Sequence, residues 1–199
     1  MEKINRTKAP DWLTEKWPEW GKKWQRKYST TQKSSDFQWY RNKNQGYDEL
    51  VQALSEMTRH HCSFCDAYPM VKRISHTIEH FRPKTKFPFL AYQWENLFLC
   101  CGICQKKGDN FDEDLLKPDE ENYNFDKYFD IRWDTGELIP NLDASEKEQK
   151  RAEITIQLYK LNEYGKPNDR LEELKKFNDS HSPEIDRFSY IFFLKAGSL

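Results

Sequence analysis

The chain lacks a long apolar run. No stretch approaches the roughly 18 consecutive apolar residues of a membrane-spanning helix, and the mean hydropathy over the 199 residues is -1.02. Residues 1–6 also lack the apolar segment of a secretory signal. These absences predict a cytoplasmic protein with no membrane association.

Aliphatic side chains are scarce as well. Hydrophobic residues make up 37% of the chain and charged residues 33%, so an aliphatic core would be thin. Thirteen Phe, ten Tyr and seven Trp compensate in part, because each aromatic ring buries a large area. The length, with no internal repeat, predicts one domain or one core with extensions.

Net charge is nearly absent, at -1, but this balance conceals an asymmetry. Residues 1–45 hold eleven Lys or Arg against five Asp or Glu, whereas residues 105–130 hold four Lys against nine acids. The basic segment can face a phosphate backbone and the acidic segment a protein partner. Alternatively, both are solvated faces, which is the commoner origin of such runs.

Cysteine is limited to five residues, an odd number with spacing unlike a disulfide framework. Four of them form two C-x2-C pairs, Cys62 with Cys65 and Cys101 with Cys104. Each pair is a turn that directs two thiolates at one ion, so together they predict a closed, structural Zn²⁺ site. A redox dithiol is excluded because neither pair opens a helix of a βαβ unit. We interpret Cys100 as a buried strand residue.

Local patterns predict short elements around these pairs. Four tryptophans at near-helical spacing (12, 17, 20 and 24) predict a helix opened by Pro18 in its first turn. Ser145 with Glu148 is a capping box. The remaining expectations are a loop at 29–35, a helix at 48–59, strands at 75–81 and 97–99, a short helix from 105 to about 108, a linker at 109–121, a hairpin at 128–140 and a helix at 171–177.

The segment between the cysteine pairs resembles the HNH endonucleases. Their pattern is a cysteine pair, an acid and a histidine on a strand, Asn-Leu, a second cysteine pair, then Asn or His and Lys-Gly. The chain reads CSFC, IEHFRPK, WENL, CGIC and QKKG at these places. It is most similar to the HNH proteins of Septu and retron anti-phage systems, which share IEHFRPK, WENL, an opening Ile-Asn-Arg with Pro-x-Trp-Leu, and a late Thr-Ile-x-Leu-x-x-Leu-Asn helix.

The resemblance implies an α+β fold in three parts. Residues 57–115 would form a small zinc-bound ββα-metal core, HNH and treble-clef-like. Residues 1–56 would be a basic, Trp-rich helical N-terminal extension. Residues 116–199 would supply an acidic linker, a small hairpin and a helical C-terminal extension.

The resemblance also implies roles for individual residues. Glu79 would bind a catalytic Mg²⁺ or Mn²⁺, since oxygen ligands suit hard cations. Asn96 would either fix the loop beside the base or approach the metal, and a plain turn asparagine is the alternative. Gln105 stands where the family has Asn or His as second metal ligand; its longer side chain could reach the ion directly or through water.

His80 is the expected general base, because a neutral imidazole can take a proton from water at physiological pH. Adjacent strand residues point to opposite faces, so Glu79 and His80 share a site only if the strand twists or ends there, which Arg82-Pro83 favours. The remaining candidates are expected to contact nucleic acid: His76, Arg82, Lys84, Lys86, Lys106 and Lys107.

Together these features predict a metal-dependent HNH endonuclease that hydrolyses phosphodiester bonds, with DNA favoured and RNA, tRNA included, as the other substrate class. The resemblance implies an effector of anti-phage defence held by an ATPase partner, with a retron reverse transcriptase and its DNA as a further partner. The alternative is a non-catalytic zinc module that binds nucleic acid or protein. A base beside an acid speaks against that alternative.

Overall fold

The protein mixes helices with two small two-stranded sheets, which confirms the α+β class. The computed structural model describes residues 1–43, 45–70, 76–181 and 184–197. The α-helices are α1 (Asp11–Thr31), α2 (Tyr47–Met57), α3 (Phe125–Tyr128), α4 (Glu146–Leu158), α5 (Lys166–Asn178) and α6 (Ile191–Gly197). The strands are β1 (His76–His80), β2 (Leu97–Cys101), β3 (Phe129–Arg132) and β4 (Glu137–Pro140). Single 3-10 turns cover Ser34–Asp36, Pro88–Tyr92, Trp94–Asn96, Cys104–Lys107 and Ile185–Arg187.

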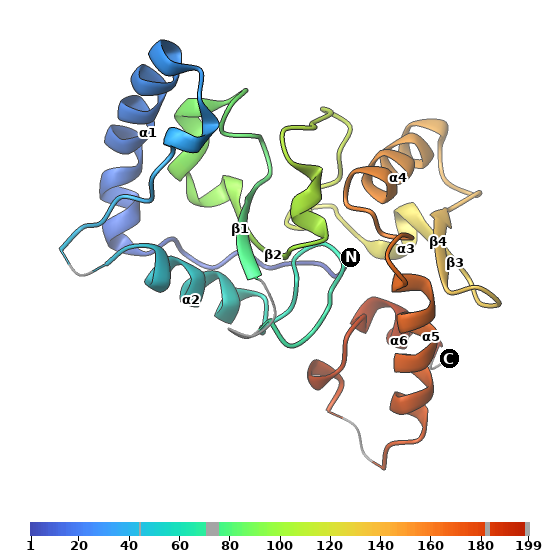
Figure 1. Cartoon of the computed structure of the whole chain (residues 1–199). Coiled ribbons are helices and arrows are strands. Elements are labelled where there is room, and N and C mark those ends of the chain that lie inside the picture. The colour runs from blue at the N-terminus through green and yellow to red at the C-terminus, as the bar shows by residue number, and fades with distance from the viewer. Residues whose placement is uncertain (44, 71–75, 182–183, 198–199) are drawn as a thin grey trace.

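The β1–β2 hairpin forms the centre of the molecule. The strands are antiparallel, with His76 opposite Cys101 and His80 opposite Leu97. Every residue of β2 is buried, including Cys100, as expected. Figure 1 shows α1 on one side of this hairpin and α4 to α6 on the other. Both predicted strands of this hairpin are therefore present; position 75, included in the first prediction, lies outside the described residues.

The second hairpin and α4 follow the sequence prediction closely. β3 and β4 pair antiparallel within the expected range, and Gly136 in the turn has a φ of 76°, which favours glycine. Ser145 and Glu148 form the predicted capping box at the start of α4. Asn162, beyond α4, bonds both backbone groups of Leu138. The C-terminal elements are thus fastened to the β3–β4 hairpin by specific side chains.

Helix α1 starts earlier than predicted. It begins at Asp11 behind Pro10, and Pro18 lies inside it. Pro10 is the N-cap residue, and its carbonyl oxygen accepts from the N–H groups of Leu13 and Thr14; the prediction that Pro18 opens the helix is wrong. The helix also runs through 29–31, part of the predicted loop. No helix in the described ranges combines the length and apolar composition needed to cross a bilayer.

The tryptophan stripe of α1 is core rather than exposed surface. Trp20 and Trp24 are buried, and Trp17 packs edge-on against Phe89 with ring centroids 5.3 Å apart. The stripe lies against the Pro88–Tyr92 turn of the long β1–β2 loop. The Nε1 of Trp24 donates to the carbonyl oxygen of Lys84 at 2.9 Å. The N-terminal helix therefore supports the loop that follows β1.

The tightest point of this packing is Gly21. A Cβ there would lie 2.2 Å from the carbonyl oxygen of Phe89. We expect Gly21→Ala to lower the free energy of unfolding by about 1–3 kcal/mol through overpacking, although alanine is the better helix former. Denaturant titration measures this, with the exposed Lys22→Ala as control. Equal or greater stability of Gly21→Ala would contradict the packing.

Two further segments are packed against the central hairpin. Arg6 pairs with Asp119 at 2.6 Å and donates to the carbonyl oxygens of Trp94 and Leu97. Residues 109–121, predicted as a linker, contain no helix or strand but bury Leu115 and Leu116. This acidic segment is consequently part of the folded unit.

Candidate functional site

The four paired cysteines form one buried cluster. The sulfur atoms of Cys62, Cys65, Cys101 and Cys104 all lie within 4.8 Å of one another, and none is in a disulfide. The sulfurs of Cys65 and Cys101 are 3.6 Å apart, close to the edge of about 3.8 Å that a tetrahedron with Zn–S bonds of 2.3 Å would have. The cluster therefore fits a metal ion such as zinc. Within the described ranges, no other group of three or more Cys, His, Asp or Glu side chains converges in this way.

The cluster joins distant parts of the chain. Its first turn precedes β1, and its second begins at the end of β2. Helix α5 adds Lys166, whose buried ammonium lies 3.7 Å from the sulfur of Cys104 and donates to the carbonyl oxygens of Tyr159 and Lys160. Four thiolates around a divalent ion carry excess negative charge, and this lysine offsets part of it.

A second site lies at the other end of β1. Glu79 and His80 line the same pocket of about 50 Å³, although they are neighbours on a strand. β1 ends at His80, and Pro83 follows in the pocket wall. The alternation of side chains between the two faces of a strand therefore stops at this point, and both side chains can line one pocket. The complete lining is Glu79, His80, Pro83, Lys84, Gln105, Gly108 and Asp109. The structure thus brings the acid, the imidazole and the amide of Gln105 together.

The protonation state of His80 follows from its hydrogen bond. Its Nε2 lies 2.9 Å from the carbonyl oxygen of Ala91. A carbonyl oxygen only accepts, so Nε2 carries the proton and Nδ1 keeps a lone pair. Burial, with Lys84 nearby, lowers the pKa of His80 to about 3. The ring is therefore a neutral imidazole, with Nδ1 as its unprotonated nitrogen.

Aromatic rings from the N-terminal part of the chain cover this histidine. Trp39 stacks on His80 with centroids 5.5 Å apart and planes 10° apart. Phe37 meets it edge-on at 5.3 Å and also stacks on Tyr92. These rings create the burial that keeps His80 neutral. No sequence pattern predicts these contacts, because residues 37–39 are distant from β1 in the chain and follow no regular spacing.

The neutral histidine makes the fold sensitive to acid. Between pH 6.5 and about 3 the unfolded chain binds a proton at His80 that the folded chain does not, so stability present above pH 6.5 is lost as the pH falls. Between pH 7 and 5 we expect His80→Gln to lose about 2 kcal/mol less than the parent protein. Chemical denaturation at both pH values, with zinc content verified, measures this. Equal losses in both proteins would contradict the assigned state of His80.

Both oxygens of Glu79 face cations or donors. Oε1 lies 2.7 Å from the ammonium of Lys107, and Oε2 accepts from Nε2 of Gln105 at 2.7 Å. Burial raises the pKa of Glu79 to about 7, against the opposing effect of Lys107. Oε1 is buried, so this oxygen faces the Lys107 ammonium and is closed off from solvent. The carboxylate of Glu79 lines the pocket, and oxygen ligands of this kind suit a hard cation.

Asn96 fixes the loop that follows β1. Its Oδ1 accepts from the backbone N–H of Arg82 at 2.7 Å, and its Nδ2 donates to the carbonyl oxygens of Arg82 and Leu90. These bonds use both ends of the amide. Asn96 therefore bonds the loop next to the segment that carries the acceptor of His80 and is not among the residues that line the pocket; its role in catalysis stays a prediction.

Gln105 lies beside Glu79, but its amide nitrogen faces the carboxylate. Its Oε1 faces Cys100, whose thiol donates to it at 3.7 Å. For its oxygen to meet a cation shared with Glu79, the amide would have to turn about its last bond. The side chain of Gln105 is therefore long enough to reach the carboxylate of Glu79, as expected. It is the amide nitrogen that faces this carboxylate, whereas metal binding would use the amide oxygen.

The other candidates divide by position. Lys84 lines the pocket, and Lys86 is exposed. Lys106 lies over the ring of Tyr164, and Arg82 forms two bonds to the carboxylate of Glu113. His76 lies at the opposite end of β1, about 13 Å along the strand from His80 and outside the pocket lining.

Lys107 requires a correction. We expected this lysine to contact phosphate, but its side chain is fully buried against Glu79. A buried ammonium that is already paired does not meet a phosphate backbone at the surface. Two neighbouring lysines with the same sequence signal, Lys106 and Lys107, thus have opposite environments.

Asp109 is a pocket residue that the sequence reasoning missed. It lines the pocket with Glu79, and its charge contributes to raising the pKa of that carboxyl group. Its position directly after the Lys-Gly of the motif indicates that it lies near the site, whereas the prediction of a linker at 109–121 places it outside. It provides a second carboxylate at this pocket.

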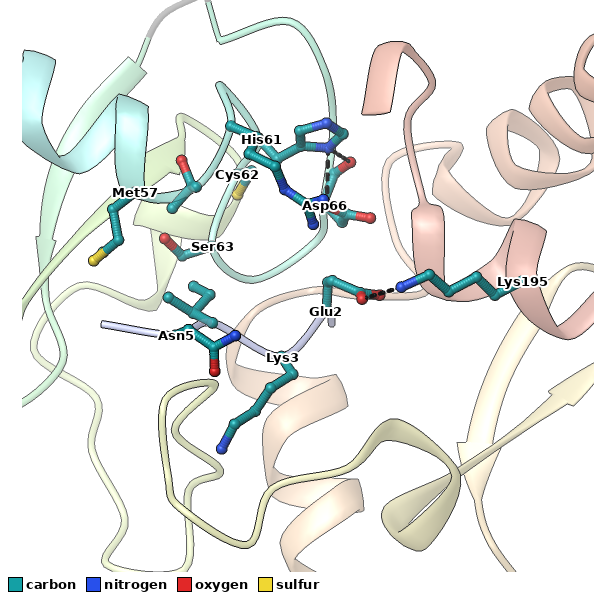
Figure 2. A pocket seen from close by; sticks show the side chains of 12 residues that line it. Glu2, Lys3, Asn5, Met57, His61, Cys62, Ser63, Asp66 and Lys195 are labelled. Atoms are coloured by element: carbon teal, nitrogen blue, oxygen red, sulfur yellow. Dashed lines mark hydrogen bonds and ion pairs between the residues drawn. The ribbon is translucent and has the colours of Figure 1, made fainter. Parts of the chain in front are cut away.

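A larger polar pocket, of about 360 Å³, lies beside the first cysteine pair (Figure 2). His61 bonds Asp66 at 2.9 Å and the carbonyl oxygen of Asp186 at 3.0 Å. Burial lowers the pKa of His61, but the bond to Asp66, the charge of Asp66 and two backbone hydrogen bonds together outweigh it, and the net shift is upward. Across the pocket Glu2 pairs with Lys195. These contacts connect the first cysteine turn and the N-terminal segment to the C-terminal segment.

The overall geometry is therefore a buried thiol cluster at one end of the β1–β2 hairpin and an acid–imidazole pocket at the other. The thiol cluster fits a metal, and the pocket combines a proton acceptor with carboxylates. A comparison with protein-family models and a comparison with curated proteins both find no match to this chain.

Proposed function

We propose that this protein is a metal-dependent endonuclease of the HNH type, hydrolysing phosphodiester bonds with DNA favoured over RNA. The observation that carries the proposal is the shared pocket of Glu79 and His80, in which Nε2 of His80 is bonded to Ala91 and Nδ1 is left as the unprotonated ring nitrogen. In the proposed ββα-metal core, β1, β2 and the Cys104–Lys107 turn are held by zinc at the four cysteines.

In this proposal, separate residues accept the proton, position the base and bind the metal. Nδ1 of His80 takes the proton from a water molecule that attacks phosphorus, while Ala91 holds the ring by its Nε2–H. Asn96 keeps the Ala91 loop in place. Glu79 and Asp109, with Gln105 after rotation of its amide, would hold Mg²⁺ or Mn²⁺. A bound divalent cation supplies stabilisation of the charge on the leaving 3′ oxygen.

Lys84 is the lysine best placed to meet the substrate. It lines the pocket beside His80, and its ammonium lies 5.3 Å from the ring centroid of Phe37. Phosphate contacts of this kind position nucleic acid without reading its sequence. Lys86, exposed on the same loop, extends this basic surface.

The test is a cleavage assay with the zinc-loaded protein on DNA and on RNA. We expect cutting only when Mg²⁺ or Mn²⁺ is added, with 5′-phosphate and 3′-hydroxyl ends. Cutting without any added divalent cation would contradict the proposal. Absence of cutting on both substrates, alone and with an ATPase partner, would favour the non-catalytic zinc module.

The proposed setting is anti-phage defence, which follows from the likeness of IEHFRPK and WENL to Septu and retron HNH proteins. In this setting an ATPase holds the nuclease, with a retron reverse transcriptase and its DNA as a further component. Co-purification with the product of an adjacent ATPase gene tests this. A chain that stays free of such a partner at high concentration would argue for a nuclease that acts alone.

A further inference from the structure

Lys107 is a buried cation inside the proposed nuclease site. Its side chain is 0% exposed, and its ammonium lies 2.7 Å from Oε1 of Glu79. Four backbone carbonyl oxygens surround the same ammonium at 3.2–3.4 Å, those of His80, Phe81, Gly108 and Asn110. An ammonium has three N–H donors, so five oxygens share one positive charge.

These oxygens come from the two sides of the site. His80 is the last residue of β1 and Phe81 follows it directly, whereas Gly108 and Asn110 follow the second cysteine pair. Glu79 and Asp109 line the pocket beside them. The ammonium thus fastens the base-bearing strand to the segment that carries Gln105 and Asp109.

We propose that Lys107 is a positioning residue for Glu79, a built-in cation that holds this carboxylate at the wall of the cation pocket. The catalytic part of this role rests on the proposed function. The carbonyl cage, meaning the four carbonyl oxygens around the Lys107 ammonium, does not depend on it. Lys107 acts through Glu79 and touches no substrate, because its side chain is closed off from solvent.

Lys106 provides a matched control. It precedes Lys107 directly, but its side chain is exposed and its ammonium bonds the hydroxyl of Tyr164 at 2.9 Å. Removing its charge leaves Glu79 and the carbonyl cage unchanged. Lys106→Met therefore reports the effect of losing one lysine from this turn without losing the ion pair.

The first measurement is a double-mutant cycle on thermal stability. Lys107→Met and Glu79→Gln each leave one buried charge without its partner, and we expect each to lower Tm by about 10 °C. The double variant removes both charges and should lose clearly less than the sum of the two. Lys106→Met should shift Tm by about 1 °C or less. Additive losses would overturn the proposal, and if Lys107→Met alone fails to fold, recovery in the double variant still decides it.

The second measurement is chemical rescue. Lys107→Ala removes three methylenes and the ammonium, which propylammonium can replace. We expect propylammonium to raise the Tm of this variant saturably, and propan-1-ol, of the same length but uncharged, to leave it unchanged. Equal rescue by the alcohol would assign Lys107 to packing alone and overturn its role as a cation.

The third measurement tests whether the Lys107 ammonium affects cation binding in the pocket of Glu79. Mn²⁺ alone is titrated against the zinc-loaded protein and followed by electron paramagnetic resonance. We expect Lys107→Met to weaken Mn²⁺ binding about tenfold or more, as for other groups that orient a metal ligand, and Lys106→Met to leave it within about twofold. Unchanged or tighter binding in Lys107→Met would overturn the positioning role. Because none of these readouts is cleavage, failure of the proposed function would be seen separately in the nuclease assay.

Discussion

We expect the centre of this protein to unfold when zinc is removed. Structural zinc sites contribute about 10–16 kcal/mol in small peptides, which equals or exceeds the whole stability of a typical domain, about 5–15 kcal/mol. Only 37% of the chain is hydrophobic, so little apolar burial is left to compensate. Loss of the metal would also leave Lys166 buried beside thiols that have regained their protons.

Cysteine variants separate the metal from the thiols. Cys101→Ser removes one cluster sulfur, whereas Cys100→Ser changes the adjacent buried thiol outside the cluster. We expect Cys101→Ser, or a strong chelator on the parent, to abolish the cooperative transition followed by tryptophan fluorescence. Cys100→Ser should keep one zinc per chain and a cooperative transition at lower temperature. A parent protein that stays folded after complete zinc removal would contradict a structural role.

The sequence predicted the parts of the fold that depend on local chemistry. Spacing alone identified the four cysteines, because a C-x2-C turn brings two thiols together whatever surrounds it. Ser145 with Glu148 located the start of α4 for the same reason. The prediction that Pro18 opens the first helix is wrong, because prolines at two positions could open it. Packing of α1 on the β1–β2 loop requires the earlier start, after Pro10.

The surroundings of the candidate site were not predictable in this way. Trp39 and Phe37 reach His80 across a large sequence separation, and an aromatic residue in a loop has no periodic pattern that names its partner. Lys106 and Lys107 look equivalent in sequence, yet only one of them points into the interior. Identity and spacing therefore predicted which residues carry chemistry, and tertiary contacts determined their protonation, partners and access.

The second large effect is expected at His80 itself. His80→Ala should reduce Mg²⁺-dependent cleavage at least about 100-fold, because a positioned general base contributes typically 10²–10⁴-fold. His80→Gln is the stricter variant, since its amide can still donate to Ala91 but cannot accept a proton from water. Both losses should appear in kcat, with zinc content unchanged. Cleavage within about threefold of the parent in both variants would remove His80 from the mechanism.

The pH profile distinguishes the acid from the base. His80 has a pKa of about 3, so it stays neutral across the range in which the protein is assayed. Glu79 has a pKa of about 7 because it is buried, so its ionised fraction rises as the pH passes through 7. If the ionised carboxylate holds the cation, cleavage at low Mn²⁺ should increase roughly tenfold per pH unit below 7 and level off above it. Higher Mn²⁺ should move this rise to lower pH, since metal and proton compete for the same carboxylate. A loss of cleavage on lowering the pH with a midpoint near 6.5 at every Mn²⁺ concentration would instead indicate protonation of an exposed histidine, contrary to the packing of His80 against Trp39 and Phe37.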